Sequence, residues 1–406
     1  MFLEILLFMA GGIAIGVLTG LLPGLHPNTV FVLVLSLAAA FTSFPVICTL
    51  VFIVSLSVSN VFLDFIPSIL FGAPDPDSCL SVLPGHQMLM DGRGYEAVFL
   101  SAMGGLGAIL LTIATLPLLL FAIPGIYSQI HPFIHVLLIA VVGWMVWTER
   151  KRAWAALIFL LAGLFGLIAL NGLPSDMALF PALTGLFGFS GLVVSFYGKS
   201  KLPEQRKGCR MQLGSMKAAA TGWLAGMLAG LLPGIGSSQA AAVTGQAFRA
   251  KTKDFLISIG GINAANIIFT LVAFYTLGKT RSGAVSAIAQ LTQSISYSEL
   301  TLLMAAALTT TLLSVVLTLK AAGIVTTRIH SISYRKLNLS IIVFLLAAVA
   351  ILTGLLGMLI CLAGTLLGIA AIKLGIKRSH MMGFLILPTI LYFSGLDAVA
   401  QHMLGI

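Results

Sequence analysis

Long apolar runs alternate with short polar segments along the chain, in the pattern of helices that cross a membrane. Residues 153–170 and 178–196 are two such runs, and Asn171-Gly-Leu-Pro-Ser-Asp176 separates them. A bilayer core takes about 20 consecutive apolar residues per helix. Runs of this kind fill most of the chain, so the sequence predicts an all-α polytopic membrane protein with about 10–12 membrane segments.

Composition excludes a soluble protein. Of 406 residues, 59% are hydrophobic and 8% are charged, whereas roughly 25% of a soluble domain is charged. The net charge of +10 does not indicate a nucleic-acid partner, because the Lys and Arg residues gather between apolar runs at 150–152, 199–217 and 249–253. Such clusters are typical of cytoplasmic loops. We therefore expect a multi-pass protein of the cell membrane. Its helices would be surrounded by the lipid bilayer, and its N-terminus would lie outside.

The chain contains an internal repeat. Gly16-Val-Leu-Thr-Gly-Leu-Leu-Pro-Gly24 recurs as Gly226-Met-Leu-Ala-Gly-Leu-Leu-Pro-Gly234, an offset of 210 (226 − 16). Downstream, Asn60 and Gly72 match Asn266 and Gly278 at an offset of 206 (266 − 60). With the N-terminus outside and the basic residues before the second copy inside, the copies are predicted to be inverted repeats.

The predicted division of the chain follows from this repeat. We expect a first repeat with helical hairpins at 1–150, linker helices and a basic cytoplasmic loop at 151–213, a second repeat at 214–336, and C-terminal helices at 337–406.

The second copy predicts a broken or re-entrant helical hairpin. Lys217 and Arg249 flank 31 residues (249 − 217 − 1), with Pro233 and Gly234 in the middle. Two arms of about 15 residues rise about 23 Å each, less than the ~30 Å bilayer core. A pair of tilted spanning helices is the alternative.

The breaks predict where an anion binds. Pro233 and Gly234 end one helix, and the next begins near Gly236, with free N–H groups that attract a negative charge at mid-depth. Asn side chains in apolar runs either join helices or line the transport path. The predicted substrate-binding residues are Pro23, Gly24, His26, Asn28, Thr29, Asn60, Pro233, Gly234, Gly236, Ser237, Ser238, Asn263, Asn266, Lys279 and Arg281.

Three acidic residues are candidates for coupling to a cation. Asp64 lies in an apolar run, where a carboxylate is costly and usually marks an ion or proton pathway. Asp75 and Asp77 occupy the turn that matches Lys279 and Arg281 in the second copy. A structural hydrogen bond for Asp64 and ordinary solvated loops for the two turns are the alternatives. The coupling ion would be Na⁺ or H⁺, and no other cofactor is expected.

Nothing in the sequence predicts an enzyme. The four cysteines lack the spacing of a metal site, and HExxH, GxSxG and GxxxxGK[ST] are absent. A membrane-embedded enzyme that uses Asp64, Asp75 and Asp77 stays an alternative of a different class.

Three stretches carry a resemblance to a known family. They are Leu21-Leu-Pro-Gly-Leu25; Pro84-Gly-His-Gln-Met-Leu-Met-Asp-Gly-Arg-Gly-Tyr-Glu-Ala97; and Leu232-Pro-Gly-Ile-Gly236 with Asn263-Ala-Ala-Asn266 and Thr276-Leu-Gly278. In this order they resemble the large permease of tripartite tricarboxylate transporters, the TctA family. This chain is similar to a shortened and divergent member, with Pro74-Asp75 and Lys279-Thr-Arg281 where the family has Pro-Gly turns.

The resemblance implies cation-driven import of carboxylates together with a small membrane subunit and an extracytoplasmic binding protein. It also implies that Pro23, Gly24, Pro233, Gly234, Asn263 and Asn266 belong to the substrate and ion region. We therefore expect a secondary transporter for an organic anion, with alternating access around paired hairpin tips. A carrier of polyprenyl-phosphate lipids is the runner-up. A homo-oligomer is compatible with the sequence.

Overall fold

Helices make up the regular structure of the part of the chain that can be described. The computed structural model describes residues 1–22, 31, 44–73, 79–172, 175–196, 203–206, 216–232, 236–247, 251–329 and 334–404. Every regular element within these ranges is helical. The prediction of an all-α polytopic membrane protein is confirmed.

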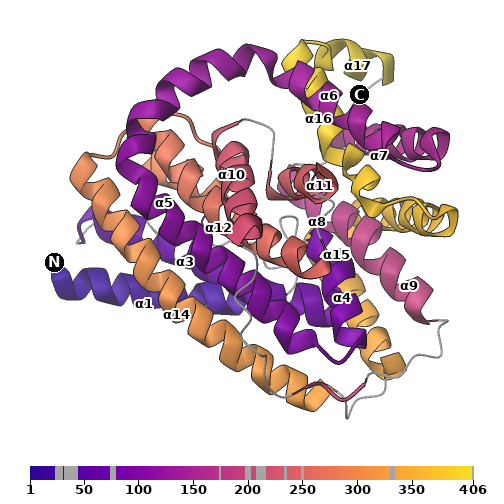
Figure 1. Cartoon of the computed structure of the whole chain (residues 1–406), viewed down its shortest axis with the longest axis horizontal. Helices are drawn as coiled ribbons and strands as arrows, with labels where there is room; N and C mark the ends of the chain where they lie inside the picture. Colours follow the sequence, from indigo (N-terminus) through magenta and orange to yellow (C-terminus); the bar gives the residue numbers. More distant parts are fainter. Residues whose placement is uncertain are drawn as a thin grey trace.

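Two sequence segments intertwine to form what we call the core bundle. Its helices from the first segment are α1 (Phe2–Leu21), α3 (Val46–Ile66) with the π-helical turn η2 (Pro67–Phe71), η3 (Cys79–Ser81), α4 (Val82–Met90) and α5 (Gly94–Ile130). Those from the second segment are α10 (Met216–Leu231), α11 (Ser237–Ala247), α12 (Thr252–Leu277), α13 (Gly283–Leu291) and α14 (Tyr297–Ile329). Figure 1 shows α5 and α14 running diagonally across this bundle.

The remaining helices pack together as the flanking bundle. They are η4 (His131–Phe133), α6 (Ile134–Trp147), α7 (Arg152–Gly172), α8 (Ser175–Leu183), η5 (Thr184–Phe189), α9 (Ser190–Phe196), α15 (Tyr334–Leu374), η6 (Arg378–Met382), α16 (Gly383–Ser394) and α17 (Asp397–Leu404). α15 is kinked at Gly354, whose φ is 64°. In Figure 1, α7, α16 and α17 lie on the side of the molecule opposite α1.

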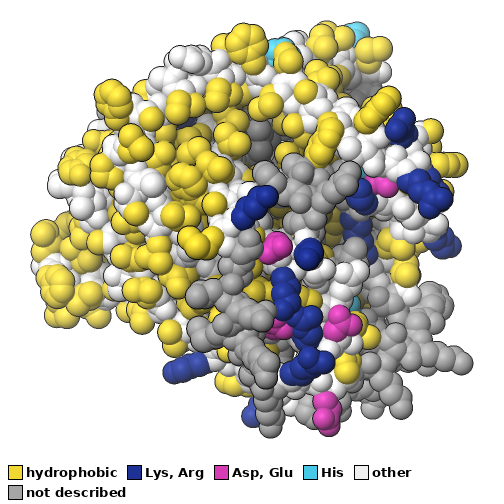
Figure 2. Space-filling model, viewed as in Figure 1, with side chains coloured by type: hydrophobic (Ala, Val, Ile, Leu, Met, Phe, Trp, Pro, Cys, Tyr) yellow, Lys and Arg dark blue, Asp and Glu magenta, His cyan; other side chains and the backbone are white. Residues whose placement is uncertain are grey.

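The surface of the molecule is that of a membrane protein. Figure 2 shows apolar side chains over most of one face, with Lys and Arg gathered toward one side of it. Large apolar residues such as Phe121 and Leu355 are 88% and 74% exposed, which lipid tolerates and water disfavours. Within the described residues, seven helices are long and apolar enough to span a membrane, or up to eight if a bent pair counts as one span. Two shorter apolar helices, Ile134–Trp147 and Ala178–Val194, accompany them.

Glycines spaced four residues apart pack α1 against α3 and α10 against α12. A side-chain carbon at Gly16 would lie 2.5 Å from the carbonyl oxygen of Leu56, and one at Gly226 would lie 2.6 Å from Ala265 Cβ. Small residues at this spacing let two helix backbones approach closely, as is common in membranes. The glycines of the two stripes are Gly12, Gly16 and Gly20 in α1 and Gly222, Gly226 and Gly230 in α10.

The contacts of the second stripe show that α10 and α11 form a helical hairpin. Gly222 lies against Ser258 and Gly230 against Asn266, so α10 runs parallel to α12. α11 runs back, because Ser237 bonds to Asn266 and Gly245 lies against Phe255. The 16 residues of α10 rise only about 24 Å, so the hairpin ends partway along α12.

The first stripe repeats this geometry. Gly12 lies against Phe52 and Gly20 against Asn60, so α1 also runs parallel to the long helix that follows it. α3 with η2 covers 46–71 and α12 covers 252–277, 26 residues each. Both end on a glycine with positive φ, 67° at Gly72 and 62° at Gly278. The two copies therefore share helix length, helix end and packing register.

The long helices α3 and α5 run in opposite directions. A side-chain carbon at Gly94, the first residue of α5, would meet Leu70 near the end of the first copy's long helix at 3.0 Å. One at Gly105 would meet the Phe62 ring at 2.9 Å. As α5 proceeds, its contacts move backwards along α3.

The helices α5 and α12, by contrast, run in the same direction. Glu96 pairs with Lys253 at the start of both helices. Further along, a side-chain carbon at Gly105 would lie 3.3 Å from Ala264 Cβ. Since α3 opposes α5 and α5 parallels α12, the equivalent helices α3 and α12 run in opposite directions.

Candidate functional site

The predicted site residues fall into two groups. Nine of them lie outside the described residues: Pro23, Gly24, His26, Asn28, Thr29, Asp75, Asp77, Pro233 and Gly234. The others lie in α3, α11 and α12 or within a few residues of their ends, and the structure places each of them.

Asn60 joins the end of α1 to the middle of α3. It is 6% exposed, and its Nδ2 donates to Thr19 Oγ1 over 3.1 Å. Thr19 in turn donates to the carbonyl of Gly16 over 3.2 Å. The amide is thus satisfied by the helix that leads into the first break, which meets the requirement that buried polar groups be hydrogen-bonded.

Asn266 occupies the matching place in α12 but bonds differently. Its Nδ2 donates to Ser237 Oγ over 3.1 Å, and Ser237 belongs to α11, the helix that follows the second break. The start of α11 is also tied by Gly236 N, which donates to Gln239 Oε1 over 2.9 Å, as in a capping box. Ser238 contacts Cys79 Sγ at 3.3 Å, so α11 is fixed to both segments of the core bundle.

Asn60 and Asn266 lie at about the same level of the bundle. Gly105 of α5 touches Phe62, two residues from Asn60, and Ala264, two residues from Asn266. Phe62 follows Asn60 in α3, whereas Ala264 precedes Asn266 in α12. Because α3 and α12 run in opposite directions, both asparagines are displaced from the level of Gly105 toward the same end of the bundle. The ends of α1 and α10 therefore meet their long helices at one common depth.

Two further polar residues lie inside these long helices. Asp64 accepts a hydrogen bond from Ser68 Oγ over 3.2 Å, one turn later in the same helix. Asn263 is 3% exposed, and its Oδ1 has no hydrogen-bond partner among the described residues. An unsatisfied buried oxygen costs free energy, and such an oxygen is a suitable ligand for a bound cation.

Lys279 and Arg281 follow the glycine that ends α12. Lys279 is exposed. Arg281 Nη2 donates to Tyr127 Oη over 2.7 Å, and its guanidinium lies 5.5 Å from the centre of that ring. Tyr127 lies near the end of α5, so Arg281 joins this turn to the far end of the longest core helix of the first segment. The anion clamp predicted for this pair stays a prediction.

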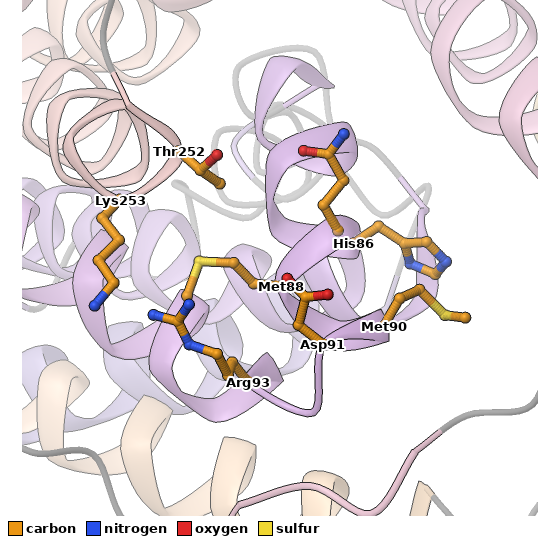
Figure 3. A pocket seen from close by; sticks show the side chains of 8 residues that line it. His86, Met88, Met90, Asp91, Arg93, Thr252 and Lys253 are labelled. Carbon is orange, nitrogen blue, oxygen red and sulfur yellow. The ribbon is translucent and has the colours of Figure 1, made fainter.

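A cavity of about 450 Å³ lies between α4 and the start of α12. Figure 3 shows the charged ends of Arg93 and Lys253 on one side of it and His86 on the other. Both cations bind Glu96, at 2.7 and 2.8 Å. Burial lowers the pKa of the His86 imidazole, so this residue is neutral at pH 7.

A short stretch of the basic loop fastens this end of the core bundle. Gln205 donates to the Leu89 carbonyl over 3.0 Å and accepts from Gly94 N over 2.9 Å, and Arg206 N donates to the Gly92 carbonyl. These bonds hold the turn between α4 and α5 beside the basic loop, which the sequence predicts to be cytoplasmic.

Sequence reasoning missed several of these contacts. The ion pair of Glu96 with Lys253 carries no local signal, because the two residues are far apart in sequence. The glycine stripes did carry one, since glycine at every fourth position of an apolar helix is a known packing motif.

Comparison with known proteins gave two matches. A family model described as "Tripartite tricarboxylate transporter TctA family" matches residues 6–383. An uncharacterized protein of Methanocaldococcus jannaschii is 30% identical over 404 residues, which cover 96% of this chain and 98% of that protein. No solved structure matches this chain.

Proposed function

Because this chain belongs to the tripartite tricarboxylate transporter TctA family, which is a family of transporters and not of enzymes, we propose that it is a secondary transporter of an organic anion. The family and the apolar helices make it a multi-pass membrane protein. The substrate is a carboxylate, the membrane is the cell membrane, and movement follows alternating access around the two helix breaks.

One observation carries this proposal: α1 and α10 end against equivalent asparagines at one common depth, from opposite directions. Inverted repeats with broken helices build the substrate site of many secondary transporters near the bilayer midplane. The two units are such repeats, and the α10–α11 hairpin is re-entrant. Free helix ends at that depth suit a carboxylate.

Cation coupling is the second part of the proposal. Asp64 and the unpartnered oxygen of Asn263 supply oxygen ligands in helices of opposite direction. Sodium or a proton bound there would balance the charge of the entering anion. The family name also favours operation with a small membrane subunit and an extracytoplasmic binding protein.

Transport in proteoliposomes tests the function. Uptake of radiolabelled citrate and smaller carboxylates is measured with sodium and proton gradients imposed separately. We expect carboxylate uptake driven by one of the two cations. Absence of uptake for every carboxylate, with and without the accessory subunits, would reject the function.

Asp64→Asn tests the coupling. The amide keeps an acceptor for Ser68 and a similar volume, so the protein should fold, while uptake should lose its dependence on the cation gradient. Asp91→Asn is the matched control, because Asp91 lies beyond the end of α4. An unchanged gradient dependence in Asp64→Asn would return that residue to a structural role.

A further inference from the structure

A second cavity, of about 180 Å³, lies where the core and flanking bundles meet. From the core bundle it is lined by Cys79 of η3 and by Ala241, Ala242 and Gly245 on one face of α11. Phe187 of η5 and Arg378 of η6 close it from the flanking bundle. This volume is well above the ~10–15 Å³ that one water needs. We call this space the interbundle cavity.

Arg378 is the dominant charge of this cavity, and no described carboxylate balances it. Its Nη1 donates to the Phe187 carbonyl over 2.9 Å. The neighbouring cation, Lys377, has a partner in Glu149 at 3.4 Å, and that carboxylate also faces His380. A guanidinium carries five N–H donors, so Arg378 retains donors for a further acceptor.

The surroundings of Arg378 leave room for the guanidinium but offer it little polar compensation. A side-chain carbon at Gly191 would lie 2.9 Å from Nη2, so the glycine is what allows the guanidinium to lie there. The residues that α11 contributes to the cavity, Ala241, Ala242 and Gly245, have no polar side chain. A partly buried cation with one neutral acceptor is costly unless an anion joins it.

We propose that Arg378 binds a carboxylate group of the transported anion in the interbundle cavity. The inference rests on the proposed function, and it adds a binding residue outside the two helix breaks. Arg is suited to this role because its planar fork matches a carboxylate in a bidentate pair. The cavity follows α11 from Cys79, beside Ser238, to Phe255 near the start of α12, which is the end with basic flanks. The anion therefore meets Arg378 between the helix break and the cytoplasm.

The location is tested with Cys79 as the reporter, in a variant with the other three cysteines replaced. Thiosulfonate reagents of opposite charge are applied to membrane vesicles of known orientation. We expect faster labelling by the anionic reagent, slower labelling when citrate is added, and loss of both effects in Arg378→Gln. Equal rates for the two reagents, or no citrate protection, would overturn the proposal.

The energetic role is tested by citrate uptake. Arg378→Gln should raise KM about tenfold or more, as expected for loss of a charged hydrogen bond, and Arg378→Lys should lie in between. Lys373→Gln is the control, because this exposed lysine of α15 also removes one charge but does not line the cavity. Equal KM values for Arg378→Gln and Lys373→Gln would contradict the proposal.

A third variant covers the case in which Arg378→Gln does not fold. Gly191→Ala keeps the charge but displaces Nη2, and it should weaken citrate protection of Cys79. Unchanged protection would count against the proposal. If wild-type protein transports no carboxylate, the proposed function fails; if transport stands while the Cys79 effects are absent, only the role of Arg378 fails.

Discussion

The two copies of the repeated unit share their backbone packing but not their polar contacts. α1 meets α3 and α10 meets α12 through glycines at the same register, and both long helices end on a glycine with positive φ. Yet Asn60 bonds to the helix before its break, whereas Asn266 bonds to the helix after its break. Helix packing that depends on glycine tolerates few substitutions. The hydrogen bonds beside the breaks can differ between the copies, because each break can contact a different part of the ligand.

The largest effects should come from the shared packing. Gly16→Ala and Gly226→Ala each place a carbon within 2.7 Å of the facing helix, and we expect a loss of about 1–3 kcal/mol in the free energy of unfolding. Gly143→Ala is the control, because nothing lies within 4 Å of a carbon there. Thermal unfolding in detergent measures the effect. Similar melting temperatures for all three variants would show that the stripes do not hold the units together.

Replacing the equivalent asparagines should affect the stability of the two copies differently. Asn266→Ala leaves the fully buried hydroxyl of Ser237 without its donor, which should cost about 1–2 kcal/mol. Asn60→Ala should cost less than about 1 kcal/mol, since Thr19 keeps its bond to Gly16. Unfolding of each variant with and without citrate distinguishes a structural role from binding. A larger loss for Asn60→Ala would reverse this part of the comparison.

The last long helix of each unit has a glutamate in its first turn, Glu96 in α5 and Glu299 in α14. Glu96 pairs with Arg93 and Lys253, whereas Glu299 accepts from Ser296 N at 2.7 Å as a local cap. Glu96→Gln should cost about 1 kcal/mol at low ionic strength and less at high salt, because the pairs are partly exposed. Glu299→Gln keeps an acceptor and should cost a few tenths of that, independent of salt. Identical salt dependence in the two variants would contradict the assignment.

The smallest effect on stability should come from Lys279. It is exposed, so Lys279→Ala should change the free energy of unfolding by less than about 0.5 kcal/mol. If the turn attracts the anion, citrate uptake should nevertheless show a raised KM. An unchanged KM in this variant would remove Lys279 from the substrate path.

Much of the fold could be predicted because its signals are local. Apolar runs indicated the helices, and the Leu-Leu-Pro-Gly motif indicated where α1 and α10 end. Matching Asn60 with Asn266 identified the equivalent positions before their hydrogen bonds were known. The basic residues near Lys217 gave the expected orientation of the second copy.

Contacts between distant segments could not be predicted in this way. The bond from Arg281 to Tyr127 joins residues far apart in sequence, and no periodicity brings α5 to that turn. Arg378 follows Lys373 and Lys377 in the sequence, which gives no sign of its contacts, because its place beside Phe187 and Gly191 depends on how η5 and η6 pack. The breaks themselves at Pro23 and Pro233 lie outside the described residues.

The glycine stripes have a consequence for how such a unit acquires its direction in the membrane. A helix face of glycines packs in the same way whichever side of the bilayer the helix enters from. The same glycine interface therefore works in both orientations. The orientation of each unit must then be set by the charged residues that flank its helices. The first unit has few lysines and arginines there, and the second has many. Moving those flanking charges, without any change in the packed interior, is the change that would invert the orientation of a unit in the membrane.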